Sequence, residues 1–142
     1  MAADQQRREE AMKKILLVSP YVASDVRAFW VTGGDGKAMD VPGVMVPLGL
    51  ATIAALTPES YHLDIWDECI RGLIDDDTVF KHDYDLVGIT GYLAHLPRVK
   101  QVAEVFRKKD VPVAVGGPGI SAAPPMLTEE DCTVIFVGEA ER

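Results

Sequence analysis

Two runs of small residues are the parts of this chain best suited to bind a ligand. One run is Gly116-Gly117-Pro118-Gly119, and the other is Thr90-Gly91. Each follows a short apolar stretch that is typical of a buried β-strand. Glycine lets the backbone adopt positive φ and approach a ligand closely, and the exposed N–H groups suit a phosphate. A tight turn between a strand and a helix would also use glycine, so both explanations stay open here.

Several common catalytic motifs are absent from the sequence. The first predicted strand is followed by Ser19-Pro20-Tyr21, without the G-x-G-x-x-G turn of a dinucleotide site. Neither a G-x-x-x-x-G-K-[ST] phosphate loop nor a G-x-S-x-G hydrolase elbow occurs. Ile89-Thr90 stands where a phosphoacceptor domain would carry an aspartate. We therefore expect no catalytic residue of these classes.

Alternating strands and helices must position the small residues. Apolar stretches predict strands near residues 14–18, 62–66, 85–90, 111–116 and 133–137, of which the second alternates as an edge strand does. Helices are predicted at residues 47–56, 70–80 and 99–109, with one or two further turns at residues 124–131. This order predicts an α/β fold with a doubly wound, five-stranded parallel sheet. We expect the flavodoxin-like (Rossmann-like) strand order 2-1-3-4-5.

Ligands of such a sheet bind at the carboxyl ends of its strands. The candidate binding residues therefore follow the first, third, fourth and fifth strands: Ser19, Pro20, Tyr21, Thr90, Gly91, Tyr92, Leu93, Gly116, Gly117, Pro118, Gly119, Gly138 and Glu139. The long loop at residues 21–46 is expected to lie over this edge and to be the least ordered internal segment without a ligand. Asp67 and Glu68 follow the second strand, where we expect solvated loop acids. Trp66 is expected to pack rather than to bind a cofactor.

The composition sets limits on partners and location. The chain has 142 residues and a net charge of −8, which argues against binding to nucleic acid or to anionic lipid. Residues 1–13 are predicted to be a flexible tail without a signal-peptide core, and no apolar run is long enough for a membrane helix. The two cysteines, Cys69 and Cys132, fit free thiols in a reducing compartment. We expect a cytoplasmic protein.

Six segments in a fixed order resemble the N-terminal cobalamin (B12)-binding domain of cobalamin-dependent radical-SAM proteins. They read KILLVSP, PLGLATIAAL, HLDIWDE, DLVGITGYL, VPVAVGGPG and VIFVGEAE, and the resemblance covers residues 14–142. It implies that cobalamin lies along the carboxyl edge of the sheet. The nucleotide tail of the cofactor would then enter near Thr90, Gly91 and Tyr92 and near Gly116 and Gly117.

The same resemblance implies that the chain is not catalytic alone. Radical-SAM chemistry needs a C-x-x-x-C-x-x-C loop for its [4Fe–4S] cluster, which Cys69 and Cys132 cannot supply. The cluster and S-adenosylmethionine are therefore expected in a missing catalytic domain or partner subunit, where the parent enzyme would catalyse methyl transfer or rearrangement. A free-standing corrinoid carrier or sensor, and an assembly domain without a cofactor, are the alternatives.

The cobalt is expected to be base-off with no protein histidine beneath it. Cobalamin domains that ligate cobalt carry D-x-H-x-x-G after the first strand, whereas residues 19–46 contain no histidine. The match Asp67-Glu68-Cys69-Ile70-Arg71-Gly72 follows the second strand and is interpreted as chance. His95 is near the correct edge, but we expect it to cap or to be satisfied at the surface. Tyr92 or Leu93 would instead lie under the corrin ring.

The sequence ends at residues 138–142, where a fifth helix would begin. In the predicted topology this helix covers the same face of the sheet as the first helix. Without it, Val134, Phe136 or their neighbours are expected to be exposed unless the N-terminal tail or a partner covers them, so the chain should self-associate or be weakly stable.

Overall fold

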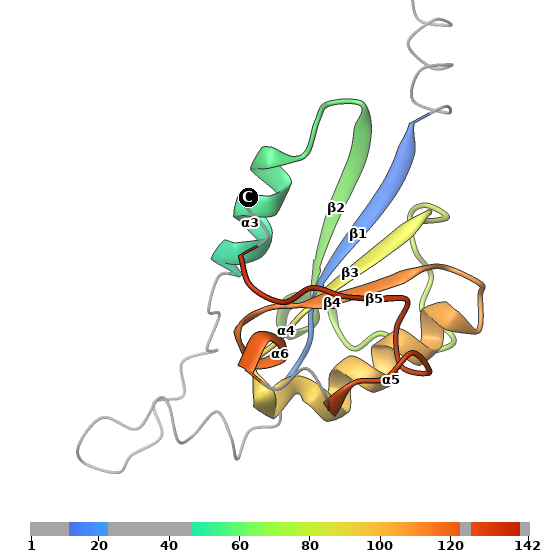
Figure 1. The fold of residues 1–142 in the computed structure, drawn as a ribbon. Helices are drawn as coiled ribbons and strands as arrows, with labels where there is room; N and C mark the ends of the chain where they lie inside the picture. Colours follow the sequence, from blue (N-terminus) through green and yellow to red (C-terminus); the bar gives the residue numbers. More distant parts are fainter. Residues whose placement is uncertain (1–11, 23–46, 123–125, 140–142) are drawn as a thin grey trace, which may run out of the picture.

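The computed structural model describes residues 12–22, 47–122 and 126–139. Its centre is a five-stranded sheet in the order β2-β1-β3-β4-β5, with every neighbouring pair parallel (Figure 1). The strands are β1 (Lys13–Ser19), β2 (Tyr61–Asp67), β3 (Leu86–Thr90), β4 (Val113–Gly116) and β5 (Val134–Ile135). The predicted α/β fold and strand order are confirmed, and β2 is an edge strand as expected.

One face of the sheet carries the hydrophobic core. Every second side chain of a strand points to the same face, and here those side chains are apolar in β1, β3 and β4. Helix α5 (Leu96–Arg107) covers this face with apolar residues at helical spacing. The buried residues shared by these four elements are Leu16, Val18, Val87, Ile89, Val99, Val102, Phe106, Val113 and Val115. Because each contributes about 1.5–3 kcal/mol on burial, this face is the main source of stability.

The opposite face is covered incompletely. Helix α3 (Leu48–Leu56) lies there, on the other side of the sheet from α5 (Figure 1). The sequence of α3 is largely apolar, yet its only buried residue is Leu50. Leu48 and Leu56 are 72% and 60% exposed. A helix that is apolar on all sides is normally packed on all sides, so this face of the domain has apolar surface left over.

The short helices differ from the sequence-based expectation. Instead of a helix over residues 70–80, α4 (Glu68–Arg71) is a single turn, and residues 72–85 contain no helix or strand. The Asp67 side chain accepts the Cys69 N–H at the start of α4, and Gly72 ends it with φ 93°. Two further short helices, η1 (Leu93–His95) and α6 (Pro118–Ala122), begin directly after β3 and β4.

Some expectations concern parts of the chain outside the described residues. These are residues 1–11 of the predicted tail, residues 23–46 of the predicted long loop, and residues 123–125 and 140–142. The described part of the region expected to form one or two turns, residues 126–131, contains no α-helix. Among the described helices, none is long and apolar enough to cross a membrane.

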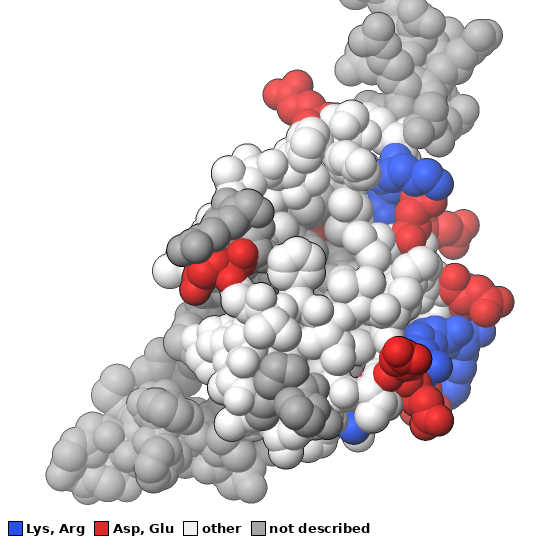
Figure 2. Space-filling view, viewed as in Figure 1, with Lys and Arg blue, Asp and Glu red and all other residues white. Residues whose placement is uncertain are grey.

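The edge formed by β5 is apolar and exposed, as predicted. Val134, Phe136 and Val137 are 47%, 50% and 59% exposed. In the described residues no helix follows β5. The surface around β4 and β5 in Figure 2 is largely free of charged side chains. An exposed apolar strand edge is a template for pairing with another chain.

We predict that the chain self-associates through this edge and that Val137→Lys shifts it toward monomer, because a lysine directly beside an edge strand opposes pairing. Sedimentation velocity over a range of protein concentrations measures the effect. Val79→Lys is the matched control, since Val79 is 89% exposed but lies away from β5, and it should leave association unchanged. A wild-type chain that stays monomeric at high concentration would contradict the prediction.

Candidate functional site

The carboxyl ends of β3 and β4 bring two predicted segments into direct contact. Thr90 pairs with Gly116 in the sheet. Beyond them, the Gly91 N–H donates to the Gly116 carbonyl at 3.1 Å, and the Gly119 N–H donates to the Gly91 carbonyl at 3.0 Å. The two small-residue runs therefore form one interlocked pair of loops at the carboxyl edge.

The glycines permit a very close approach between these two loops. A Cβ atom on Gly119 would lie 2.2 Å from the backbone nitrogen of Leu93. A Cβ atom on Gly117, which has φ +107°, would lie 2.9 Å from the backbone nitrogen of Gly91. No side chain fits at either position. Packing of one loop against the other thus accounts for Gly117 and Gly119, which the sequence alone could not assign to a turn or to a ligand.

A second set of small residues lies within the strands, on the face that α3 covers incompletely. Burial alternates along β3 and β4, so Val87, Ile89, Val113 and Val115 are buried on the α5 side while the residues between them are partly exposed. The partly exposed set is Gly88, Thr90, Ala114 and Gly116, which we call the small-residue face. Central strands of a doubly wound sheet are usually buried on both faces. The small-residue face is therefore a place where the sheet itself is open to a ligand.

Apolar side chains border the small-residue face on both sides. A Cβ atom on Gly88 would lie 2.8 Å from Leu17 Cδ2 of β1. A Cβ atom on Gly116 would lie 3.2 Å from Phe136 Cβ, just after β5. Of the four residues, sequence reasoning identified Thr90 and Gly116 but missed Gly88 and Ala114. Their signal is that small residues occupy one face of two otherwise apolar strands.

The remaining predicted residues also lie at the carboxyl edge. Tyr92 and Leu93 are about half exposed just beyond β3, and Pro118 and Glu139 are exposed. The Gly138 N–H donates to Ser121 Oγ at 2.9 Å, which ties the end of β5 to α6. At the end of β1, Ser19 is partly exposed whereas Pro20 is buried.

His95 has the capping role that the sequence predicted. Its Nδ1 atom accepts the backbone N–H of Tyr92 at 3.0 Å. Burial lowers the pKa of His95 below its usual value. The imidazole is therefore neutral near pH 7, and Nδ1 is already occupied by a hydrogen bond.

Asp67 and Glu68 are not solvated loop acids, and that expectation was wrong. Both are buried, and the Glu68 side chain has no exposed surface. Arg98 of α5 holds Glu68 with two hydrogen bonds, from Nη2 to Oε1 at 2.6 Å and from Nε to Oε2 at 2.9 Å. The N–H groups of Tyr21 and Ile74 complete the shell at 2.8 Å and 2.7 Å. Sequence reasoning missed this site because Arg98 is distant along the chain and looks like an ordinary helix-surface residue.

The expectation for Trp66 is confirmed. Its ring packs against Phe80 with the centroids 5.5 Å apart, and its indole N–H donates to the Gly72 carbonyl at 2.9 Å. These contacts hold the segment after α4 against β2. Trp66 therefore acts as a packing residue.

Residues 38–142 match the family model of the B12 binding domain. The chain belongs to this family. The match confirms the resemblance to cobalamin-binding domains. The B12-binding domain is built around the switch point between β1 and β3, where ligands of such sheets bind.

Two curated proteins are similar to this B12-binding domain. Bacteriochlorophyllide d C-8(2)-methyltransferase of Chlorobaculum tepidum is 36% identical over 95 residues, covering 66% of this chain and 20% of that protein. Hopanoid C-2 methylase of Rhodopseudomonas palustris is 36% identical over 103 residues, covering 70% of this chain and 18% of that protein. The chain thus spans about a fifth of the length of these relatives. No solved structure matches it significantly.

We predict that Glu68→Gln destabilises the domain by about 3 kcal/mol, because it leaves the Arg98 charge largely buried without its counter-ion. Urea unfolding measures the change. Asp76→Asn is the matched control, since Asp76 pairs with Lys108 at 3.1 Å on the exposed surface. The control should cost about 0–1 kcal/mol. Equal losses of unfolding free energy in the two variants would show that the buried Glu68–Arg98 pair stabilises the domain no more than a surface pair does.

Proposed function

We propose that this domain binds cobalamin with the corrin ring over the carboxyl edge and the nucleotide tail along the small-residue face. The observation that carries the proposal is the alternation of burial in β3 and β4, where Gly88, Thr90, Ala114 and Gly116 stay partly exposed in the middle of the sheet. A flat, bulky group can lie there without displacing side chains. The remaining predicted residues at the strand ends would surround the ring.

The interlocked loops beside this face would limit how the tail can enter. Hydrogen bonds from Gly91 to Gly116 and from Gly119 to Gly91 use the N–H groups that point between the loops. The tail would therefore meet the Thr90 side chain and the surface of the strands rather than the backbone inside the loop pair. When bound, cobalamin would supply cobalt-centred methyl-transfer chemistry.

The cofactor is proposed to be base-off without a histidine ligand. His95 is the histidine nearest the carboxyl edge, and its Nδ1 atom already accepts the Tyr92 N–H. The half-exposed side chains of Tyr92 and Leu93 follow β3 directly, where they could shield the lower face of the ring. An open lower axial position favours reduction of cobalt, which suits methyl transfer.

The chemistry is proposed to reside in a larger assembly. A radical-SAM domain or partner subunit would hold the [4Fe–4S] cluster and S-adenosylmethionine, for which this chain has no C-x-x-x-C-x-x-C loop. Both similar proteins are named for methylation, which favours methyl transfer over rearrangement. A chain with only two cysteines, Cys69 and Cys132, has too few for a disulfide scaffold of the secreted kind, which favours the cytoplasm.

We predict that Ala114→Leu weakens hydroxocobalamin binding about tenfold or more. A leucine there would fill the small-residue face, and overpacking typically costs 1–3 kcal/mol, or about one to two powers of ten in affinity. Absorbance titration of the purified chain measures the dissociation constant. Ala55→Leu, the same change on an exposed position of α3, should leave the affinity unchanged.

The titration, together with a pull-down, distinguishes our proposal from the alternatives. A chain that binds no cobalamin under any condition would support the assembly domain and contradict our proposal. Equal binding by the wild type and by Ala114→Leu would place the tail elsewhere. A corrinoid carrier or sensor would bind cobalamin but would need no radical-SAM partner, which a pull-down with the candidate catalytic domain tests.

We predict that the Co(II) form of the bound cofactor shows no superhyperfine splitting from an axial nitrogen in electron paramagnetic resonance. His95→Ala should leave the spectrum unchanged, because His95 caps the loop and does not ligate cobalt. Nitrogen splitting that disappears in His95→Ala would identify His95 as the ligand. Splitting that persists in the variant would show that the cofactor keeps its own base.

A further inference from the structure

Three potential metal ligands meet at the amino end of the sheet, away from the cobalamin edge. They are His62 and Asp64 of β2 and His82 of the irregular segment before β3, and their ligand atoms all lie within 4.8 Å of one another. His62 Nε2 is 3.2 Å from Asp64 Oδ2, and His82 Nε2 is 4.0 Å from the same oxygen. All three side chains are partly buried: His62 is 36% exposed, Asp64 25% and His82 22%.

Strand geometry explains why the first two ligands converge. Side chains two residues apart on a strand point to the same face, so His62 and Asp64 share a face with Trp66. Trp66 and Phe80 hold residues 72–85 against this face with a ring contact of 5.5 Å. That packing brings His82 against His62, with ring centroids 4.6 Å apart.

One atom of the cluster lacks a hydrogen-bond partner. His82 Nε2 is the buried side-chain nitrogen or oxygen atom of the described residues that has none. Such an atom in a folded protein needs an explanation, of which an ion is one. It faces Asp64 at a distance too long for a hydrogen bond but short enough for a shared metal ion.

We propose that His62, Asp64 and His82 form a site for a divalent metal ion of the zinc type. Two imidazoles and one carboxylate are ligands that Zn²⁺ accepts, with a fourth position left for water. Bonds of about 2.0–2.1 Å would place ligand atoms roughly 3.3 Å apart in a tetrahedron, which small side-chain shifts achieve here. Zinc would take the place of the proton between His62 Nε2 and Asp64 Oδ2, and in a neutral ring that proton would move to Nδ1 by exchange with solvent, so that the ligand stays a neutral imidazole.

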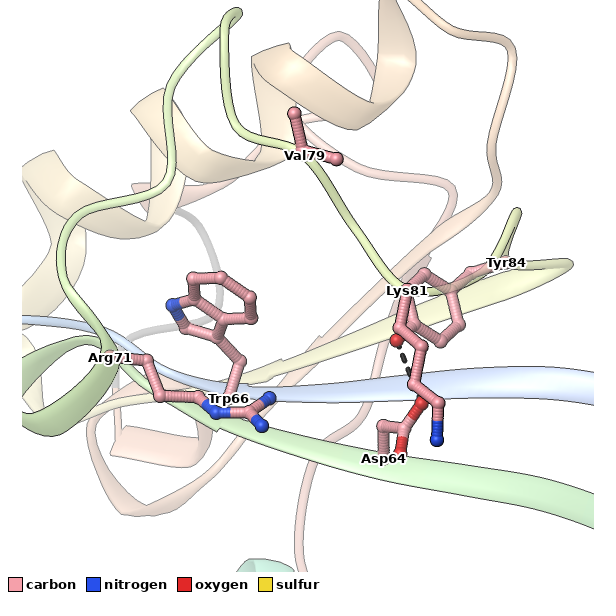
Figure 3. Close-up of a pocket in the computed structure, with 6 residues that line it drawn as sticks. All are labelled: Asp64, Trp66, Arg71, Val79, Lys81 and Tyr84. Carbon is pink, nitrogen blue, oxygen red and sulfur yellow. Dashed lines mark hydrogen bonds between the residues drawn. The ribbon is translucent and has the colours of Figure 1, made fainter.

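The surroundings suit neutral imidazole ligands and an ionised carboxylate. Tyr84 donates its hydroxyl proton to Asp64 Oδ2 at 2.8 Å, a contact visible in Figure 3, and so orients the carboxylate. Partial burial opposes ionisation of Asp64, but the hydrogen bonds from Tyr84 and His62 outweigh it and lower its pKa. Loss of solvent, with nearby His62 and Lys14, lowers the pKa of His82.

A metal ion here would have a structural role, joining two segments of the chain, rather than a catalytic one. Residues 72–85 cross the face of β2 without regular hydrogen bonding. A bond network from His82 to His62 and Asp64 would fix this segment to the edge strand. This inference is independent of the proposed function, because the cluster lies at the opposite end of the sheet from the cobalamin edge.

Isothermal titration of the full chain without an affinity tag, first freed of metal with a chelator, tests the proposal with Zn²⁺ as the probe. We expect one zinc per chain and a raised thermal midpoint. His82→Gln and Asp64→Asn should each weaken zinc binding by more than about tenfold. His95→Gln is the matched control, since His95 lies at the carboxyl edge, and it should bind zinc as the wild type does.

A second measurement needs no variant and therefore does not depend on how the variants fold. In proton NMR of the wild-type chain, zinc should shift the ring resonances of His62 and His82 and leave those of His95 in place. Co²⁺ in place of zinc should give the visible absorption of a four-coordinate site. Absence of zinc binding, undiminished binding by folded His82→Gln, or a shift confined to His95 would each overturn the proposal.

Discussion

The arrangement of the carboxyl edge depends on the hydrogen bonds that the buried Glu68 carboxylate accepts. It accepts from the Tyr21 N–H after β1, from the Ile74 N–H after α4 and from the Arg98 guanidinium of α5. A buried carboxylate that lost these donors would cost several kcal/mol, so the three segments must stay together. Because Tyr21 follows β1, Glu68 follows β2 and Arg98 lies in α5, these hydrogen bonds join the ends of two neighbouring strands to the helix that covers the core.

The parts of the fold that could be predicted are those in which one local pattern decides the structure. The continuous apolar runs of β1, β3 and β4 and the helical spacing of Val99, Val102 and Phe106 directly reflect burial on the α5 side. Strand order followed from alternation of strands and helices together with the rules for parallel sheets. The exposure of Val134 and Phe136 followed from the same topology.

The parts that could not be predicted depend on partners that are distant in sequence. Glu68 looks like a loop acid until Arg98, which is 30 residues away, is placed beside it. Gly117 and Gly119 are explained by their close contact with the loop after β3. Gly88 and Ala114 can be recognised as one surface only once β3 and β4 are known to be neighbours. His62 and His82 look like isolated residues in the sequence because nothing local shows that residues 72–85 fold back over β2.

The two ends of the sheet carry different kinds of chemistry, and the topology explains why. At the carboxyl end, strands lead into loops whose small residues leave room for a large ligand, and the Glu68–Arg98 ion pair there is buried. At the amino end, the edge strand β2 presents polar side chains that none of the described helices covers, and His82 and Tyr84 contact them from residues 72–85. Asp64 is three residues, or about 10 Å, from the end of β2, and effects at sites more than about 7–10 Å apart that share no partner usually add. The stabilisation that each proposed ligand would give the domain should therefore be independent of the other, since the cluster of His62, Asp64 and His82 lies on β2 and the segment before β3, whereas the small-residue face lies on β3 and β4.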